Sequence, residues 1–539
     1  MANADKAIPQ QSTQTMFAGM DVRWMMDRQA EARADHPFLV WAPFTGDDKS
    51  WTYKEFRDEA HQVAAGLYGR GVRAGDFVLL HFDNCPEILI AWYACAVLGA
   101  VGVTTNARSS GPELTYFAEN SGAVAAITQP KFAKLVGDNC PALKWVVVTD
   151  NDNGDAPKDG TTPDAADAFT SLYGDPSTLP ERAADAMAPV GVQYTSGTTS
   201  RPKGVVWTHA NALWGASQCA RGQGLNGDDV HLTYLPLFHT NAQAYSVLSI
   251  YWAGGTCVIQ PRFSSSRFWD VSLKYKCTWS SMVPFMPRAL LGQEVPKDHS
   301  YRWFGCGINE APWDKYFGIP TLGWWGMTET IAPGIIGFHD MPNRPLSMGR
   351  PAPGYEVTVE DDAGNAVGAG ARGHLKIKGI RGVSLFLEYL NNPEATENSY
   401  DEQGRFLTGD LVLVNDDGSL SFADRDKDML KVGGENVAAS EIERVVNSVP
   451  GVMESAVVAR HDDMLDEVPV AFVLPGDGSA DDHMRASKMA EAVMRACEEQ
   501  LADFKVPREV RVVDALPRST LDKIAKNELR ARLKTEQGR

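Results

Sequence analysis

The sequence is poor in paired cysteines, in long apolar runs and in positive charge. Its eight cysteines among 539 residues include no Cys-x-x-Cys pair, which argues against a zinc site or a disulfide framework and favours free thiols in a reducing compartment. The most apolar stretch, from Ile88 to Val103, is too short to span a membrane and is typical of a buried core. The stretch from Met1 to Gln14 is polar, so we expect no secretory signal and a cytoplasmic protein.

The charge balance restricts the partners of the chain. A net charge of −18 argues against general binding to nucleic acid or anionic membranes, because such binding needs clustered Lys and Arg. Hydrophobic residues at 44% and charged residues at 22% are typical of a soluble globular protein. The length requires at least two domains. The oligomeric state, including a homodimer, is left open.

The most informative stretch runs from Tyr194 to Val205, with the sequence YTSGTTSRPKGV. Backbone amides and hydroxyls of such a loop can face one anion, and Lys203 adds a full positive charge. A polar surface turn is the alternative, but so many anion-binding groups favour a phosphate site. The loop is not a Walker motif, because Lys203 is followed by Gly-Val-Val and not by a helix-opening Ser or Thr.

The pattern before this loop predicts alternating helices and strands, and hence parallel α/β layers. We expect helices over 51–67 and 86–98 and strands over 76–82, 101–103, 124–128 and 145–149, followed by an exposed excursion over 150–185.

After the loop the same alternation continues. The pattern predicts helices over 211–220 and 265–275 and strands over 229–235 and 256–259, with polar turns ending apolar runs at 303–312 and 320–330. The strand at 229–235 delivers Pro236 to Asn241 at its end, where α/β sheets bind ligands. From Tyr355 alternating residues indicate antiparallel strands with one wet face. The charged run Asp424–Asp428 suggests a domain boundary.

Four polar turns resemble, in order and spacing, the core motifs of the adenylate-forming superfamily: Thr195–Lys203, Gly326–Thr330, Thr408–Asp410 and Asp424–Asn436. That superfamily includes acyl- and aryl-CoA synthetases, peptide-synthetase adenylation domains and beetle luciferases. The resemblance extends from about Trp51 to Lys526. Within it, the runs DNCPE at 83–87, GMTETI at 326–331 and GGENV at 433–437 look most like bacterial carnitine/crotonobetaine-CoA ligases.

The resemblance implies a fold and a reaction. The fold is α/β, with a large N-terminal domain (1–424) of two α/β layered subdomains plus a β-rich subdomain. A hinge (425–427) leads to a small mobile α+β C-terminal lid (428–539). The reaction joins a carboxylic acid to ATP with Mg²⁺, releases pyrophosphate, and passes the acyl group from AMP to coenzyme A.

The resemblance also assigns roles to residues. The pyrophosphate side is assigned to Thr195, Ser196, Gly197, Thr198, Thr199 and Lys203, with Thr328 on phosphate and Glu329 on magnesium. One carboxylate suits magnesium, which prefers phosphate oxygens for its other ligands. The nucleoside side is assigned to Asn309, Glu310, Ala311, Trp325, Gly326, Met327, Asp410 and Arg425. Asp410 would accept from the ribose hydroxyls.

The C-terminal part carries three further assignments by resemblance. Lys523 matches the lysine of the adenylation step, although Asp522 replaces the glycine usual before it. Lys427 matches the hinge about which the lid turns. Gly433 and Gly434 would face the CoA thiol, although a plain glycine turn between a strand and a helix is the alternative.

The acid itself is less well defined. By resemblance His239 lies beside the substrate carboxylate. Acetate-type relatives carry a blocking Trp where this chain has Gly326, so we expect an acid larger than acetate. Gly305 and Gly307 are expected to leave room, and Thr240, Asn241 and Gln243 to add polar contacts. A quaternary ammonium would need aromatic faces, and the sequence does not say which rings face the acid.

Several functions therefore stay open. The acid is carnitine/crotonobetaine-like or, alternatively, a medium-chain, aryl or sterol side-chain acid. A stand-alone adenylation enzyme that loads a carrier protein is a rival. A luciferase-like oxygenase and a non-catalytic sensor on the same fold are others, although Glu329 and Lys523, which a sensor would be expected to lose, are both present.

Overall fold

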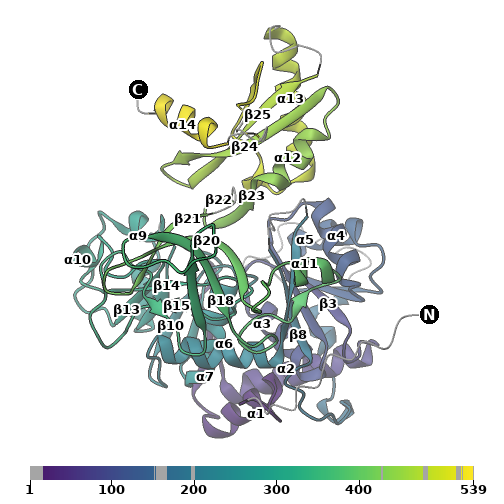
Figure 1. The fold of residues 1–539 in the computed structure, drawn as a ribbon. Coiled ribbons are helices and arrows are strands. Elements are labelled where there is room, and N and C mark those ends of the chain that lie inside the picture. Colours follow the sequence, from purple (N-terminus) through teal and green to yellow (C-terminus); the bar gives the residue numbers. More distant parts are fainter. Residues whose placement is uncertain are drawn as a thin grey trace.

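The computed structural model describes residues 16–150, 152, 167–195, 201–283, 285–425, 429–476, 483–517, 524 and 526–537. A large N-terminal domain lies below a small C-terminal domain in the view of Figure 1. We call the part from Met429 onward the lid. None of the helices in the described ranges is both long and apolar enough to cross a bilayer.

The first sheet of the large domain has eight strands and carries the glycine-rich loop. Its central strands pair in parallel, and its β8–β9 edge is antiparallel. The order is β19 (Glu388–Tyr389), β9 (Lys203–Thr208), β8 (Pro189–Thr195), β4 (Val101–Thr105), β3 (Phe77–His81), β5 (Ala125–Thr128), β6 (Val146–Val148) and β7 (Asp167–Ala168).

The second sheet has nine strands and is parallel in its centre and antiparallel at both edges. The order is β16 (Arg350–Pro351), β15 (Ile335–Ile336), β14 (Thr321–Trp325), β13 (Trp303–Cys306), β12 (Trp279–Ser281), β10 (Val230–Thr233), β11 (Thr256–Ile259), β1 (Pro37–Trp41) and β2 (Lys49–Thr52). The two sheets confirm the predicted pair of α/β layered subdomains.

The helices follow the predicted pattern closely. The helix predicted over 86–98 is α3 (Pro86–Leu98), where Pro86 starts the helix and Gly99 ends it with φ +84. It is buried almost throughout, so its apolar run is core. The other helices of the large domain are α1 (Val22–Ala32), α2 (Tyr53–Gly69), α4 (Gly111–Ser121), α5 (Pro130–Asn139), α6 (His209–Gly222), η3 (Asn241–Leu248), α7 (Ser249–Ala253), α8 (Phe268–Lys274), α9 (Phe285–Leu290), α10 (Asp314–Phe317) and α11 (Pro393–Glu397), with short turns η1 (Phe169–Leu172) and η2 (Pro176–Thr178).

A four-stranded antiparallel sheet forms the β-rich subdomain predicted from the alternation after Tyr355. Its order is β17 (Glu356–Glu360), β18 (Arg372–Lys378), β20 (Phe406–Val414) and β21 (Leu420–Arg425).

The lid has a hydrophobic core of its own, separate from that of the large domain. Its sheet contains β23 (Glu435–Ala438), β22 (Met429–Val432), β25 (Asp466–Pro475), β24 (Val452–Asp462) and β26 (Glu509–Val512). Its helices are α12 (Ala439–Asn447), α13 (His483–Gln500), the short turn η5 (Asp503–Lys505) and α14 (Lys526–Gln537). Helices and strands together make the lid the α+β unit that was predicted.

Candidate active site

The glycine-rich loop joins two antiparallel strands of the first sheet. Thr195 ends β8, Lys203 begins β9, and the two residues pair across the hairpin. Lys203 therefore opens a strand and not a helix, as predicted. Ser196, Gly197, Thr198 and Thr199 lie outside the described residues, so their assignment to the phosphates stays a prediction.

A tyrosine that the sequence did not single out joins this loop to Glu329. Tyr389 in β19 donates its hydroxyl to Glu329 Oε1 at 2.8 Å, and Lys203 Nζ lies 4.0 Å from the centre of its ring. Strand β19 reaches this place by pairing with β9. The pairing of distant segments created the contact, and no local motif marks Tyr389.

Glu329 is suited to a divalent cation. The residue is 4% exposed, and burial raises its pKa, while the hydrogen bond from Tyr389 and the charge of Lys203 act in the opposite direction. The hydrogen bond from Tyr389 engages Oε1. A buried carboxylate beside a lysine fits magnesium held chiefly by phosphate oxygens. No group of three or more His, Cys, Asp or Glu side chains suited to a metal occurs in the described ranges.

The residues assigned to the rest of this turn are held in place by backbone contacts. Trp207 Nε1 donates to the carbonyl of Thr328 at 2.9 Å, and Met327 N donates to Thr330 Oγ1 at 3.0 Å. Phe386 N donates to the carbonyl of Glu329 at 2.9 Å. The turn after β14 is therefore tied to β9 and to the segment before β19, on both sides of Glu329.

Trp325 and Asp410, both assigned to the nucleoside, contact each other directly. Trp325 ends β14, and its Nε1 donates to Asp410 Oδ2 at 2.8 Å. Asp410 follows Gly409, whose φ of +74 is a conformation that favours glycine. Arg425 ends β21 as the cross-strand partner of Asp410. The sheet thus places the backbones of the two residues opposite each other, and their roles at the ribose stay predictions.

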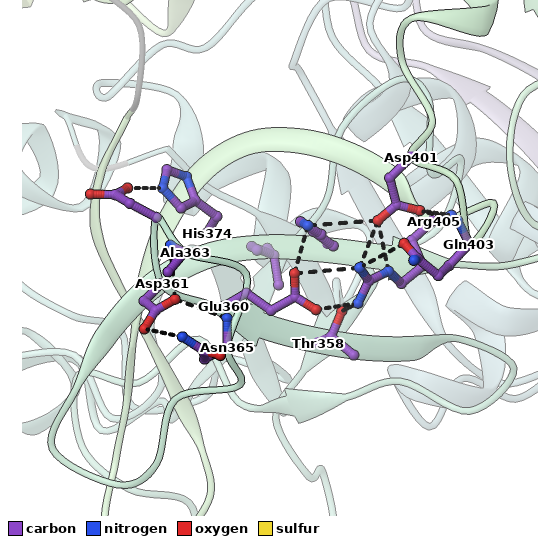
Figure 2. Close-up of polar contacts among 12 residues, drawn as sticks. Thr358, Glu360, Asp361, Ala363, Asn365, His374, Asp401, Gln403 and Arg405 are labelled. Atoms are coloured by element: carbon purple, nitrogen blue, oxygen red, sulfur yellow. Dashed lines mark hydrogen bonds and ion pairs between the residues drawn. The ribbon is translucent and has the colours of Figure 1, made fainter.

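An ion-pair network fixes the strand that carries Asp410. Figure 2 shows Glu360 of β17 and Asp401 on either side of Arg405, just before β20. Lys376 of β18 reaches Glu360 at 2.6 Å and Asp401 at 3.6 Å. Two cations and two carboxylates therefore balance their charges where β17, β18 and the start of β20 meet.

The side chain of Asn309 is engaged within the protein, and its assignment to the nucleotide stays a prediction. Its side-chain nitrogen donates to the carbonyl of Ser347 at 3.0 Å, and its oxygen accepts from Gly323 N at 2.7 Å. The side chain is fully buried, so it holds the 309–311 turn against β14. Beside it Glu310 is exposed with φ 46, and Ala311 is buried. Any contact of this turn with a nucleotide would involve the backbone or Glu310.

His239 sits on a turn that is tied to the first sheet. Asn84, which follows β3, donates to the carbonyl of Leu235 at 2.9 Å and accepts from Leu237 N at 2.8 Å. On the other side Gln243 of η3 bonds Gln193 of β8. The segments that follow β3 and β10 and a residue of β8 therefore fix the turn on which His239 lies.

The lid brings a carboxylate to this histidine. Glu435 Oε2 lies 2.7 Å from His239 Nε2, and Asn106 Nδ2 donates to the same oxygen at 3.3 Å. Burial acts to lower the pKa of His239, but the Glu435 carboxylate outweighs it and raises that pKa. Conversely, burial acts to raise the pKa of Glu435, and the charge of His239 overcomes it and lowers that pKa. The pair therefore favours an imidazolium and a carboxylate.

Two glycines make the turn that presents Glu435. Gly433 and Gly434 have φ of 59 and 86 and join β22 to β23, with Val432 and Glu435 as the closing pair. A two-residue hairpin loop with positive φ at both positions strongly prefers glycine. The turn therefore lies between two strands, and the expected alternative of a strand-to-helix turn was wrong.

Neighbouring side chains occupy the space beside two of the three glycines that were expected to leave room for the acid. A Cβ on Gly305 would lie 1.7 Å from the Trp324 ring, and one on Gly326 would lie 2.2 Å from the Tyr245 hydroxyl, whereas nothing lies within 4 Å at Gly307. The prediction that Gly305 leaves space for substrate is therefore wrong, because Trp324 uses that space. Tyr245 and Trp324 also pack edge to face, with ring centroids 5.8 Å apart.

The three polar residues expected to contact the acid near His239 all have partners within the protein, Gln243 through its bond with Gln193. Thr240 Oγ1 donates to Gln193 Oε1 at 2.7 Å, and Ser281 Oγ donates to Asn241 Oδ1 at 2.6 Å. Lys427 and Lys523 lie outside the described residues, so the hinge and the adenylation lysine stay predictions.

Known proteins match this chain over nearly its whole length. The AMP-binding enzyme family matches residues 26–390, and the AMP-binding enzyme C-terminal domain matches residues 441–523. A crotonobetaine/carnitine–CoA ligase of Salmonella agona is 34% identical over 535 residues, covering 96% of this chain and all of the relative.

Two solved structures of one enzyme, the o-succinylbenzoate CoA synthetase of Bacillus subtilis, differ in their likeness to this chain. The double mutant bound to a product analogue superposes with a TM-score of 0.80, and the complex with AMP with 0.65. Both are 26% identical and cover 94% of this chain and 97% of theirs. The chain belongs to the AMP-binding enzyme family and is an AMP-forming acid–CoA ligase, which makes an acyl-CoA through an acyl-adenylate.

Proposed function

We propose that this ligase acts on a compact carboxylic acid of the carnitine or crotonobetaine kind, and that the structure has the arrangement of the thioester-forming step. The observation that carries the second part is the 2.7 Å contact between Glu435 of the lid and His239. It brings the Gly433–Gly434 turn to the place assigned to the substrate carboxylate. The higher TM-score with the product-analogue complex than with the AMP complex supports it.

The proposed first step uses the residues of the large domain. Lys203 and the loop after Thr195 would hold the outgoing pyrophosphate. Glu329 would hold magnesium, which neutralises charge on the phosphates when bound. Trp325, Asp410 and Arg425 would hold the adenosine, and Lys523 would stabilise the charge that develops as the carboxylate attacks the α-phosphate.

In the proposed second step the lid has turned about Lys427. CoA loses its thiol proton to solvent and its sulfur attacks the acyl carbon of the adenylate, the carbon–sulfur bond forms, and AMP leaves with the electron pair of the acyl–oxygen bond. The Glu435 carboxylate raises the pKa of His239, and the imidazolium form would stabilise negative charge on the acyl oxygen. Gly433 and Gly434 let the thiol arm approach the backbone.

The filled space at Gly326 and Gly305 supports a compact acid. The Tyr245 hydroxyl and the Trp324 ring occupy the positions where larger side chains would otherwise stand. Medium-chain and sterol side-chain acids would need both to move. The name of the Salmonella agona relative supports a crotonobetaine-like acid.

A screen for pyrophosphate release tests the substrate. Crotonobetaine, carnitine, acetate, octanoate, benzoate and a sterol side-chain acid would each be mixed with ATP and Mg²⁺, with and without CoA. We expect release with crotonobetaine or carnitine, and CoA-dependent AMP formation with the same acid. Preference for octanoate or the sterol acid would contradict the compact-acid proposal. Transfer to a phosphopantetheinyl carrier protein but not to CoA would favour the carrier-loading alternative.

We also infer that the enzyme works in the cytoplasm, which the eight free and buried cysteines support. Assembly into a homodimer stays a prediction.

A further inference from the structure

A lysine of the lid is buried between two glutamates where the lid meets the large domain. Lys505 in η5 is 8% exposed. Its Nζ donates to Glu113 Oε1 of α4 and, at 2.8 Å, to Glu441 Oε1 of α12. Glu113 belongs to the large domain and Glu441 to the lid, so the charge of Lys505 is shared across the boundary.

The two glutamates depend on this lysine whenever they face each other. Glu113 and Glu441 are 7% and 3% exposed, and Glu441 Oε2 is buried with no hydrogen-bond partner among the described residues. The other oxygen of Glu113 accepts from Ser110 N at 2.7 Å. Two buried carboxylates without a cation between them would repel each other and lack solvation.

The cluster forms only when the lid occupies this position. Beside it, Arg108 pairs with Asp503 at 2.7 Å, and Ser110 Oγ donates to the carbonyl of Gln500 at 2.7 Å. The same segment of the large domain contains Asn106, which reaches Glu435. The Lys505 cluster and the contact between Glu435 and His239 therefore belong to one interface.

We propose that Lys505, together with Glu113 and Glu441, is a positioning cluster for the thioester-forming step. It holds the lid where Glu435 meets His239, and this inference rests on the proposed two-step function. Buried ion pairs add little net stability, but they can select one arrangement over others. When the lid turns away, Glu113 gains solvent and Lys505 keeps Glu441. The cluster therefore favours one arrangement without fixing the lid permanently.

The alternative is a cluster that only stabilises the fold. Glu113 distinguishes the two ideas, because it lies outside the lid and cannot support the fold of the lid from within. Loss of a fold-stabilising group would lower both half-reactions, whereas loss of a positioning group would lower the second alone.

The test compares the two half-reactions in Lys505→Met, Glu113→Gln and Lys505→Arg. Pyrophosphate release is measured with crotonobetaine and ATP without CoA, and thioester formation with supplied crotonobetainyl-adenylate and CoA. For Lys505→Met and Glu113→Gln we expect thioester formation to fall by about tenfold or more, and pyrophosphate release to stay within about twofold. Lys505→Arg keeps the charge and should recover most of the thioester activity.

A matched control removes the same kind of contact within one domain. Lys376→Met breaks the ion pairs of Lys376 with Glu360 and Asp401, and no lid residue takes part in the described contacts of these three residues. We expect it to change both half-reactions in the same proportion, since it does not act on the position of the lid.

A second readout needs no substrate. Met453 in the lid and Met341 in the large domain are 69% and 53% exposed, and all eight native cysteines are buried. Cysteines at 453 and 341 can therefore carry a dye pair for single-molecule energy transfer. We expect Lys505→Met and Glu113→Gln to reduce the population of the lid arrangement described above.

The outcomes separate the two proposals. Unchanged lid populations, or equal losses in both half-reactions, would overturn the positioning role. If the wild-type enzyme turns over none of the acids in the screen, the proposed function fails, and the energy-transfer measurement still decides the role of the cluster. If Lys505→Met does not fold, Glu113→Gln decides alone, because it leaves the lid unchanged.

Discussion

At the scale of single residues, Tyr389 connects two charges that the reaction would use together. Its ring faces the ammonium of Lys203 and its hydroxyl reaches the carboxylate of Glu329. A movement of the Lys203 side chain would therefore change the contact between Tyr389 and Glu329, and the reverse also holds.

Tyr389→Phe should weaken adenylate formation. The variant keeps the ring beside Lys203 but removes the hydrogen bond that lowers the pKa of Glu329. A hydrogen bond to a charged group contributes about 1.5–3 kcal/mol, so we expect a loss of roughly tenfold or more in pyrophosphate release. Because Glu329 would ionise at higher pH, the acidic limb of the pH profile should move upward. An unchanged limb would contradict the link between the two residues.

Tyr245→Ala should let the enzyme accept longer acids. The change removes the hydroxyl that lies 2.2 Å from a Cβ built on Gly326. We expect kcat/KM for octanoate to rise relative to crotonobetaine, and the free energy of unfolding to fall by about 3 kcal/mol or more from the cavity. Tyr245→Phe separates the hydroxyl from the ring: it removes the hydroxyl alone and should raise the relative kcat/KM for octanoate less than Tyr245→Ala does. Unchanged relative kcat/KM values in Tyr245→Ala would contradict a role in selecting the acid.

The sequence indicated those site residues whose role follows from their immediate neighbours in the chain. The hydroxyl-rich loop predicts its own anion site, and the Thr-Gly-Asp run predicts a turn that exposes Asp410. Tyr389 and Tyr245 lie in ordinary apolar segments, and only the tertiary fold brings them to Glu329 and Gly326. The resemblance assigns Asn309 to the nucleotide, whereas the bonds of its amide with Gly323 and Ser347 are visible only in the structure.

At the scale of elements, the β22–β23 hairpin is a device for placing Glu435. Its two-residue loop needs positive φ at both positions. The hairpin therefore has little freedom to change its loop without moving Glu435 away from His239.

Gly433→Ala should slow thioester formation more than adenylate formation. The new Cβ would meet Leu465 Cδ2 at 3.2 Å in a backbone conformation with φ +59, which costs about 1–2 kcal/mol. The rates of pyrophosphate release and of thioester formation from supplied adenylate, each relative to the wild type, measure this difference. Gly451→Ala is a matched control in the same lid, because its φ is +91 and its Cβ would meet Met489 Cε at 3.2 Å. It should cost similar stability without favouring either half-reaction. If Gly433→Ala and Gly451→Ala slowed thioester formation relative to adenylate formation to the same extent, the role of the hairpin would be contradicted.

Elements whose ends are marked by proline or glycine, or whose residues alternate clearly, were predicted well. Element η3 and the pairing of β19 were not predicted. Helix α3 begins at Pro86 and ends before Gly99 as the residues indicate, and the antiparallel strands after Tyr355 follow their alternation. The π-helical turn η3, over Asn241–Leu248, was not predicted, because no helix was expected between the strand end at Pro236–Asn241 and the strand over 256–259. The pairing of β19 with β9 depends on a sequence separation that no local pattern encodes.

At the scale of the whole molecule, the position of the lid should depend on pH. Glu435 raises the pKa of His239, so the contribution of this pair is full below the ordinary pKa of histidine and is lost as the pH rises through the raised value. The lowered pKa of Glu435 means that the contribution is also lost in strong acid. The pair should hold the lid best in the mildly acidic range.

The dye pair at residues 453 and 341 measures this dependence. We expect the population of the described lid arrangement to fall as the pH rises through the raised pKa of His239. His239→Asn should remove most of that change, because asparagine does not titrate. A pH profile identical in the wild type and in His239→Asn would show that another group controls the lid.

The relative position of the two domains could not be predicted from the sequence. Each domain buries its own apolar residues, so hydrophobic patterning identifies both domains but not their contact. The contact depends instead on scattered polar residues such as Glu113, Glu435 and Lys505, each of which would be typical of a solvated surface. Only the assembled structure shows that they meet.

The segment from Asn106 to Glu113 has a consequence for exchanging parts between related ligases. It reaches Glu435, Asp503, Gln500 and Lys505 of the lid through the side chains of four of its residues. A lid taken from a relative would face a segment whose side chains fit the original lid of this chain. A working hybrid would therefore need these eight residues to travel with the lid, although more than three hundred residues separate them from it along the chain.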